Sequence, residues 1–362
     1  MKKTMFYSAL LGLISSPAFG AEPLQLYGRL NLGIESMRQR GGEAAPNAVS
    51  RSRLSNYRSV FGVRGSEEVA SGLHVIFQVE GTLSPDTGAG GVAARDTRVG
   101  IEGSWGTLFA GNWTTPYNAA TASLDPFYPT TAGYMSIMGN GSAASASNVS
   151  HTSSFDRRQQ NSLHYWSPVW RGLALRVAHG FNEESGPDGA KPSLSSGALV
   201  FEAGPLYATL AHERHRGYRG PGLDDHGTKL AAAWRFGPAR VAAAVEQLHY
   251  ETRGGELERL AYYLSLTRQF GAHALKLGVA KAMDGRGGAA DAVGFVCAGR
   301  GTGAVHATLG YDYSLSKRSS VFAFYTHLRN DSRGAYDFAI NALDAAPGST
   351  VAGAAIGLRH AF

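Results

Sequence analysis

From residue 21 onward, apolar and polar side chains alternate along the chain with a period of two. In residues 24–35 every other side chain is aliphatic apart from Gly28, as at Leu24, Leu26, Leu30 and Leu32. Successive side chains of a β-strand point to opposite faces, so this alternation predicts a strand with one apolar face. The same pattern recurs at 73–79, 173–177, 206–210 and 305–309.

The alternating segments predict sixteen strands in an all-β fold. We place them near 24–37, 52–66, 72–82, 95–103, 107–114, 160–167, 173–183, 194–203, 206–214, 226–236, 239–250, 257–269, 273–283, 303–314, 319–329 and 351–362.

The connections between these segments alternate in length. Short ones carry turn residues, as in Gly204-Pro205 and Gly237-Pro238. Long ones are rich in Gly, Ser, Asn and charge, and cover 38–51, 83–94, 115–159, 184–193, 215–225, 284–302 and 330–350. Long loops at one rim and short turns at the other are typical of an antiparallel transmembrane β-barrel, which is closed because lipid cannot satisfy a free strand edge.

A barrel of sixteen strands turns its apolar face to lipid and its polar face to a lumen. It encloses an aqueous channel unless something fills it. The chain has no surplus for a plug domain, and the segment 115–159 is the one loop that we expect to fold inward. This loop is the predicted constriction.

Residues 1–20 form a separate unit. Lys2 and Lys3 precede an apolar run that ends before Ser15, and small residues, Ala18 and Gly20, precede the expected cleavage point. This pattern predicts a cleaved signal peptide, 1–20, followed by an exported barrel over 21–362. The run is too short to span a bilayer, which takes about 20 apolar residues.

Composition agrees with an exported barrel and excludes several other classes. Of 362 residues, 17% are charged against about 25% in soluble domains, and 47 are glycine. The single cysteine, Cys297, excludes a disulfide framework and a cysteine-based metal site. Although the formal net charge is +6, the basic residues are scattered, so we expect no nucleic-acid partner. We also expect no metal and no cofactor.

Six motifs in register carry a resemblance to a known family. They are Leu26-Tyr27-Gly28-Arg29-Leu30-Asn31, Phe61-Gly62-Val63-Arg64-Gly65-Ser66-Glu67-Glu68-Val69, Arg98-Val99-Gly100-Ile101-Glu102-Gly103, Asn161-Ser162-Leu163-His164-Tyr165, Leu309-Gly310-Tyr311-Asp312-Tyr313-Ser314 and the terminal Gly357-Leu358-Arg359-His360-Ala361-Phe362. With these motifs the chain resembles the general diffusion porins of Gram-negative bacteria, in particular the beta-proteobacterial outer-membrane porins.

The resemblance implies a homotrimer of sixteen-stranded barrels in the cell outer membrane, each with its third loop folded into the lumen. It also implies that the outer-membrane assembly machinery reads the last strand, which ends in Phe362. The partners would then be outer-membrane lipid, small hydrophilic solutes and inorganic ions.

Strand parity identifies the charges that face the lumen. Apolar neighbours facing lipid place Arg29, Arg58, Arg64 and Arg158 on the inward face. The resemblance adds Arg95 to the arginines of the constriction wall. Strict alternation from Arg95 would put Arg98 on the lipid side, which would require a subunit contact or a bulge.

The predicted constriction loop is poor in acid, and Asp125 is its one candidate to face the wall arginines. A turn role beside Pro126 is the alternative for this residue. The chain also departs from the family pattern, since Val60 and Asn112 stand where the resemblance implies wall arginines. An excess of inward arginine over Asp125 predicts an anion-preferring, weakly selective pore.

Other functions remain open at this level. The chain could form a substrate-specific channel, in which residues such as Tyr27, Trp166 and Tyr207 line a solute track. It could instead be an outer-membrane barrel enzyme, and His212 and His215 beside Glu213 could imitate metal ligands. An adhesin or purely structural barrel would conduct no ions.

Overall fold

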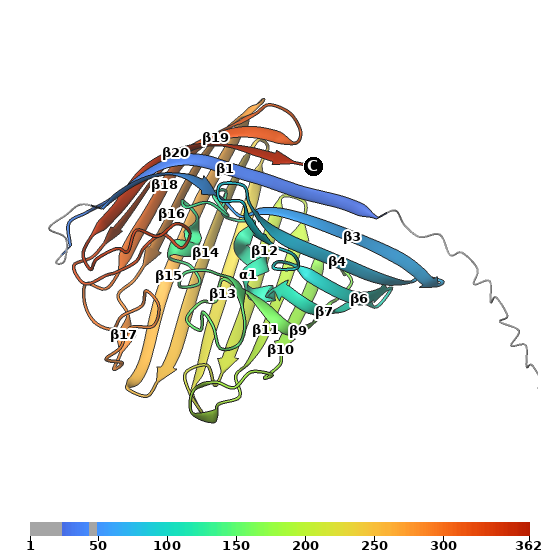
Figure 1. Ribbon diagram of the computed structural model, residues 1–362, viewed down its shortest axis with the longest axis horizontal. Coiled ribbons are helices and arrows are strands. Elements are labelled where there is room, and N and C mark those ends of the chain that lie inside the picture. The colour runs from blue at the N-terminus through green and yellow to red at the C-terminus, as the bar shows by residue number, and fades with distance from the viewer. Residues whose placement is uncertain (1–23, 43–48) are drawn as a thin grey trace, which may run out of the picture.

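The computed structural model describes residues 24–42 and 49–362. The predicted signal peptide, residues 1–20, lies outside the described residues. Sixteen antiparallel strands form a closed barrel, which confirms the predicted fold class. The ring closes where β20 pairs with β1, from Arg29 opposite Ala361 to Arg40 opposite Thr350, and the two strands run side by side in Figure 1.

The barrel strands follow one another around the ring in chain order. They are β1 (Gln25–Arg40), β2 with β3 (Ser50–Asn56 and Ser59–Ala70), β4 (Leu73–Ser84), β6 (Thr97–Gly103), β7 (Gly106–Thr114), β9 (Arg157–Trp166), β10 (Leu173–Gly180), β11 (Ser193–Ala203), β12 (Leu206–Arg216), β13 (Asp224–Phe236), β14 (Ala239–Thr252), β15 (Gly255–Phe270), β16 (His273–Ala282), β18 (Ala304–Ser314), β19 (Ser319–Asn330) and β20 (Thr350–Ala361).

The remaining elements belong to loops at one rim. They are β5 (Ala89–Gly91), α1 (Pro116–Ala122), η1 (Tyr134–Ser136), β8 (Ala143–Ala146), η2 (Pro187–Gly189) and β17 (Arg286–Gly287). The opposite rim has short turns, such as residues 204–205 and 237–238. One connection at the long-loop rim, residues 253–254, is also short, because β14 and β15 continue their pairing to Thr252 opposite Gly255. Among the described residues, no helix is long and apolar enough to cross a membrane.

The outer wall is apolar and its inward face is polar, as the alternation predicts. In β1, Leu26 and Ile34 are 57% and 65% exposed, whereas Asn31 and Glu35 are fully buried. In β13, Leu230 is exposed between the buried Lys229 and Ala231. Lipid would cover these exposed side chains, so the period-two pattern places the apolar surface where a membrane needs it.

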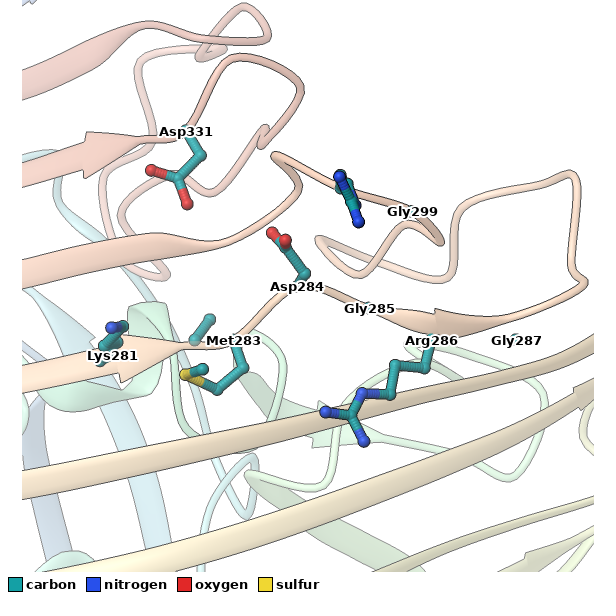
Figure 2. A pocket seen from close by; sticks show the side chains of 10 residues that line it. Lys281, Met283, Asp284, Gly285, Arg286, Gly287, Gly299 and Asp331 are labelled. Carbon is teal, nitrogen blue, oxygen red and sulfur yellow. The ribbon is translucent and has the colours of Figure 1, made fainter.

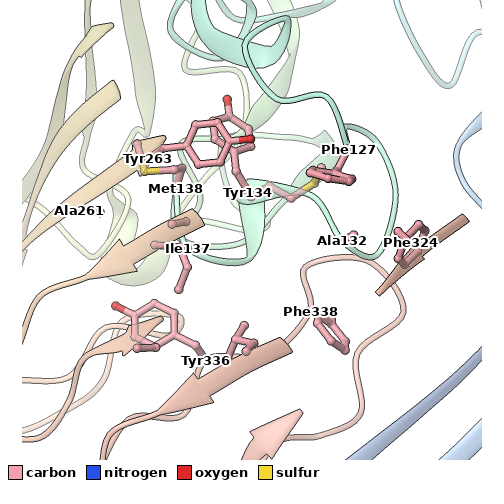
Figure 3. Close-up of a cluster of buried hydrophobic side chains, with 14 of the residues drawn as sticks. Phe127, Ala132, Tyr134, Ile137, Met138, Ala261, Tyr263, Phe324, Tyr336 and Phe338 are labelled. Atoms are coloured by element: carbon pink, nitrogen blue, oxygen red, sulfur yellow. The ribbon is translucent and has the colours of Figure 1, made fainter. Parts of the chain in front are cut away.

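Residues 115–156, here called the inner loop, fold into the barrel as predicted. Its α1 lies inside the ring of strands in Figure 1. Figure 3 shows Tyr134 and Met138 of this loop beside the wall residue Tyr263, with Phe127 and Ile137 in the same cluster. The interior therefore holds an apolar cluster as well as polar groups.

The inner loop is joined inside the barrel by a second loop, contrary to the expectation that 115–159 alone folds inward. Tyr336, Phe338 and Leu343 of the β19–β20 loop are at most 1% exposed. Figure 3 shows Tyr336 and Phe338 facing the inner loop's cluster. The local sequence does not predict this burial, because these aromatic residues become buried only where the inner loop provides an apolar partner.

Candidate functional site: the constriction in the lumen

Four of the predicted wall arginines meet around Tyr128 of the inner loop. Arg58 Nη1 donates to Tyr128 Oη over 3.0 Å, and the Arg58 guanidinium lies 5.5 Å from the centre of the Tyr128 ring. Burial raises the pKa of the Tyr128 phenol, against the opposing fields of Arg58, Arg158 and Arg95. Arg29 joins this group by donating from Nη2 to the backbone oxygen of Arg58 over 3.2 Å.

Arg58 reaches the inner loop because the second barrel strand is broken. Residues 57–58 separate β2 from β3, and Arg58 has a positive φ of 55°. A non-glycine residue in this region is uncommon and often marks a functional position. Its guanidinium also donates from Nη2 to Ser142 Oγ, so it bridges the wall and the inner loop.

Two of the four arginines are paired with carboxylates of the wall. Arg95 Nε lies 3.0 Å from Glu80 Oε1, and Arg158 Nε lies 2.7 Å from Asp96 Oδ1. Arg29 and Arg58 form no ion pair among the described residues. The arginine group, Arg29, Arg58, Arg95 and Arg158, is therefore only half neutralised by its direct partners.

Arg64 lies apart from the arginine group. Its Nε donates to Gln25 Oε1 over 2.8 Å, and its guanidinium lies 5.2 Å from the centre of the Tyr27 ring. Arg64 is on the inward face, as parity predicts, but lies further toward the short-turn rim.

Asp125 does not face the arginine group. Its Oδ1 accepts from Phe127 N over 3.0 Å and from Tyr263 Oη over 2.8 Å, and its Oδ2 accepts from Tyr134 N over 2.8 Å. The residue is 5% exposed. The structure therefore places Asp125 in the turn role that Pro126 suggested, with its carboxylate inside the loop.

Within the inner loop, Asp156 lies nearer the arginine group than Asp125 does, and the sequence reasoning missed it. Neither of its carboxylate oxygens has a hydrogen-bond partner within residues 24–42 and 49–362, although the residue is only 4% exposed. Burial raises the pKa of Asp156, and the fields of Arg58 and Lys229 oppose this rise. Its position at the end of the inner loop, directly before β9, was the available signal.

Buried charges anchor the inner loop to the opposite wall. Glu246 of β14 accepts from Gly139 N over 2.8 Å and from Tyr117 Oη over 3.0 Å, and both donors belong to the inner loop. Lys229 and Arg259 flank this carboxylate at 3.3 Å and 2.6 Å. Lys229, Glu246 and Arg259 are here called the anchor triad. All three have inward parity in their strands, so the alternation of the sequence predicts that they face the lumen.

Glu35 of β1 holds the other side of the inner loop. Its Oε2 accepts from Thr131 Oγ1 and from Tyr57 Oη, both over 2.8 Å, and its Oε1 accepts from Arg53 over 2.6 Å. The inner loop is thus fixed at both sides of the barrel, and this holds Tyr128 against Arg58.

Arg98 lies on the inward face, contrary to the parity inferred from Arg95. Its guanidinium lies 4.5 Å from Trp113 and 4.7 Å from Phe109, measured to the ring centres. Val99 faces outward and is 60% exposed. The expectation was wrong because Arg95 precedes β6, which begins at Thr97, so the two arginines do not share one alternation.

The residues that could imitate a metal site point to opposite faces of β12. His215 is buried and its Nε2 lies 2.8 Å from Glu213 Oε1, whereas His212 faces outward and contacts Thr228. Within the described part of the chain, no group of His, Cys, Asp and Glu could hold a metal ion.

A further pocket lies away from the lumen, where β16 runs into the following loop. Figure 2 shows Asp284 and Asp331 near its upper side and Lys281, Met283 and Arg286 along the strand side. Its volume is about 630 Å³. Asp284 Oδ1 accepts from the backbone nitrogens of Thr302 and Gly303, which ties this acid to the loop structure.

Comparison with known proteins agrees with this architecture. Outer membrane porin protein 32 of Delftia acidovorans is 24% identical to the chain, and an outer membrane porin protein of Bordetella pertussis is 23% identical; each alignment covers both chains fully. The solved structure of an anion-selective porin from Comamonas acidovorans superposes with a TM-score of 0.77 at 22% identity, covering 94% of this chain and 99% of that one.

A trimer form of OmpT from Vibrio cholerae also has this fold, with a TM-score of 0.62 at 16% identity, covering 94% of this chain and 99% of that one. These relatives are named as porins or outer membrane proteins, and none is named as an enzyme. Residues 8–333 match the family described as Gram-negative porin. The chain therefore belongs to the Gram-negative porin family, and it is an outer-membrane porin.

Proposed function

We propose that this porin is a weakly anion-preferring channel for small hydrophilic solutes. The observation that carries the proposal is the arginine group, in which Arg29 and Arg58 have no carboxylate partner while Arg95 and Arg158 are paired. In a narrow passage the surrounding protein screens charge less than water does, so unpaired cations attract anions strongly. Asp156 opposes them in part, which makes the preference weak.

The reversal potential across a KCl gradient in planar bilayers tests this proposal. We expect the wild type to favour chloride. Arg58→Gln removes one unpaired guanidinium and should lower the chloride-to-potassium permeability ratio by roughly twofold. Arg318→Gln removes the same charge from a short turn outside the lumen and should leave the ratio unchanged. A cation-selective wild type would contradict the proposal.

We further propose that the protein works as a homotrimer. An outward, mainly apolar groove of about 420 Å³ is lined by Phe61, Val63, Val79 and Val92, beside the loop that contains β5. Val92 is 89% exposed. An exposed apolar patch of this kind is typical of a contact surface. Native mass spectrometry of the refolded protein should show three chains, and Val92→Asp should shift the distribution toward single barrels.

A further inference from the structure

A second group of cations lies on the lumen wall, on the short-turn side of the arginine group. The pocket between these side chains has a volume of about 180 Å³ and is lined by Gln25, Arg64, Ser66, Gln78 and Arg98, among others. None of these residues belongs to the constriction around Tyr128.

Strand register places these side chains in one row. Gln25 lies opposite Arg64, Arg64 opposite Gln78, and Gln78 opposite Arg98, across β1, β3, β4 and β6. Adjacent strands are about 4.8 Å apart, so the backbones of Arg64 and Arg98 are about 10 Å apart, with Gln78 between them. Two guanidiniums on either side of an amide form a cationic pocket open to the lumen.

Arg98 carries hydrogen-bond donors that no acceptor of the described residues satisfies. Its Nε and Nη1 are buried and have no hydrogen-bond partner in the part of the chain that the structure describes. Within the described residues it forms no ion pair, and its neighbours are the rings of Trp113, Phe109 and Trp166 at 4.5, 4.7 and 5.3 Å. Cation–π contacts of this kind orient a guanidinium without neutralising it.

The acids nearest to Arg98 are engaged elsewhere. Asp96 accepts from Arg158 Nε over 2.7 Å and from Thr114, and Glu102 accepts from Thr107 Oγ1 over 2.9 Å. Arg64 is held by an amide and a ring, not by a carboxylate. The pocket therefore retains its positive charge.

We propose that this Arg64–Arg98 pocket is a second binding site for small oxyanions, namely carboxylates and phosphates, which an anion occupies after it passes the constriction. Guanidinium groups bind carboxylate and phosphate oxygens through charge-assisted hydrogen bonds. Gln78, whose Nε2 donates to the backbone oxygen of Asp96 over 2.9 Å, lies between the two guanidiniums and holds an amide beside them. The inference rests on the proposed anion-conducting function and adds a solute class to it.

Such a site makes conduction saturable. An anion that binds in the pocket stays longer in the lumen than chloride does and obstructs it, so chloride conductance falls as the oxyanion is added. Constriction charge alone sets ion preference and does not require saturation.

The test is inhibition of chloride conductance by succinate and, separately, by inorganic phosphate in planar bilayers at pH 7. We expect saturable inhibition of the wild type by at least one of the two, and the more potent one identifies the preferred oxyanion. Arg98→Gln and Arg64→Gln should each raise its half-inhibitory concentration about tenfold, because each removes a charge-assisted contact. Arg235→Gln removes an exposed inward-parity arginine from the short-turn end of β13 and should have no effect.

Arg64 is exposed, so its substitution tests the site even if Arg98→Gln fails to fold among the aromatic rings. The proposal is overturned if neither anion inhibits the wild type, or if both correctly folded variants keep half-inhibitory concentrations within about twofold of the wild type. The reversal potential of the same channels across a KCl gradient measures the anion preference separately. A pocket without function and a pore without anion preference can therefore be told apart. Inhibition that depends on Arg98 in a channel without chloride preference would support the pocket and contradict only the preference.

Discussion

At the residue scale, Asp125 shows how a single buried carboxylate can make the fold pH-dependent. Burial raises the pKa of Asp125 to about 6, although three hydrogen bonds from Phe127, Tyr134 and Tyr263 lower it. Its ordinary pKa in an unfolded chain is about 3.9. The folded state therefore binds this proton more tightly, and the contribution of Asp125 to stability falls as the pH rises through this range.

We expect acidification from pH 7.5 to pH 5 to stabilise the wild type by about 1 kcal/mol through Asp125, which is part of a full effect of about 3 kcal/mol. The asparagine of Asp125→Asn cannot titrate. Its side-chain NH2 would also stand opposite the backbone N–H of Tyr134, so two donors would face each other. The measurement is urea unfolding of the detergent-folded protein at both pH values. The difference between wild type and variant isolates Asp125 from the other carboxylates, and equal pH dependence in the two proteins would show that Asp125 has no such role.

At the element scale, the anchor triad of Lys229, Glu246 and Arg259 determines whether the inner loop stays in place. Both cations contact the Glu246 carboxylate, and all three side chains are at most 2% exposed. Removing one partner of a buried ion pair costs about 3–5 kcal/mol, because the remaining charge is left uncompensated.

Glu246→Gln should therefore release the inner loop. We expect larger and noisier single-channel conductance, together with faster proteolysis between residues 115 and 156. Glu202→Gln removes the same charge from an exposed inward position near the short-turn rim and should change neither reading. A variant with the conductance and protease resistance of the wild type would mean that the apolar cluster alone holds the loop.

The strands could be predicted from the sequence and the loop contacts could not, for a physical reason. Each strand has an apolar face toward lipid and a polar face toward the lumen, so its pattern depends on its own residues and the membrane alone. The inner loop instead packs against residues distant in sequence, such as Tyr263 and Phe338. No local period records such contacts, and the inward position of the β19–β20 loop was missed for the same reason.

The site residues divide along the same line. Parity placed Arg29 on the inward face because it belongs to the regular ladder of β1, whereas Arg58 lies in the break between β2 and β3, which the alternation does not show. Arg98 was misassigned because the boundary of β6 lies between it and Arg95. Asp125 was expected in the passage because the sequence shows a charge but not its partners, which are three donors within or beside the loop.

At the scale of the whole molecule, Phe362 extends the pairing between β1 and β20 that closes the barrel. Phe362 N donates to Gly28 O and Gly28 N donates to Phe362 O, each over 3.1 Å, which completes the pairing of the first and last strands. A side chain at Gly28 would meet the Phe362 ring at 2.4 Å, so the ring lies directly over this glycine. The ring is also 40% exposed on the outer wall.

We expect Phe362→Ser to reduce the yield of assembled outer-membrane protein in cells severalfold, because it removes the aromatic terminus that the assembly machinery is expected to read. The main-chain bonds to Gly28 remain, so protein that does assemble should keep a thermal stability within about 1 kcal/mol of the wild type. Gel mobility without heating measures the yield of assembled protein, and gel mobility after heating to a series of temperatures measures its thermal stability. Phe270→Ser removes another exposed aromatic ring from the short-turn rim and controls for loss of membrane contact. An equal fall in yield for both variants would assign the effect to lipid contact and contradict a specific role for Phe362.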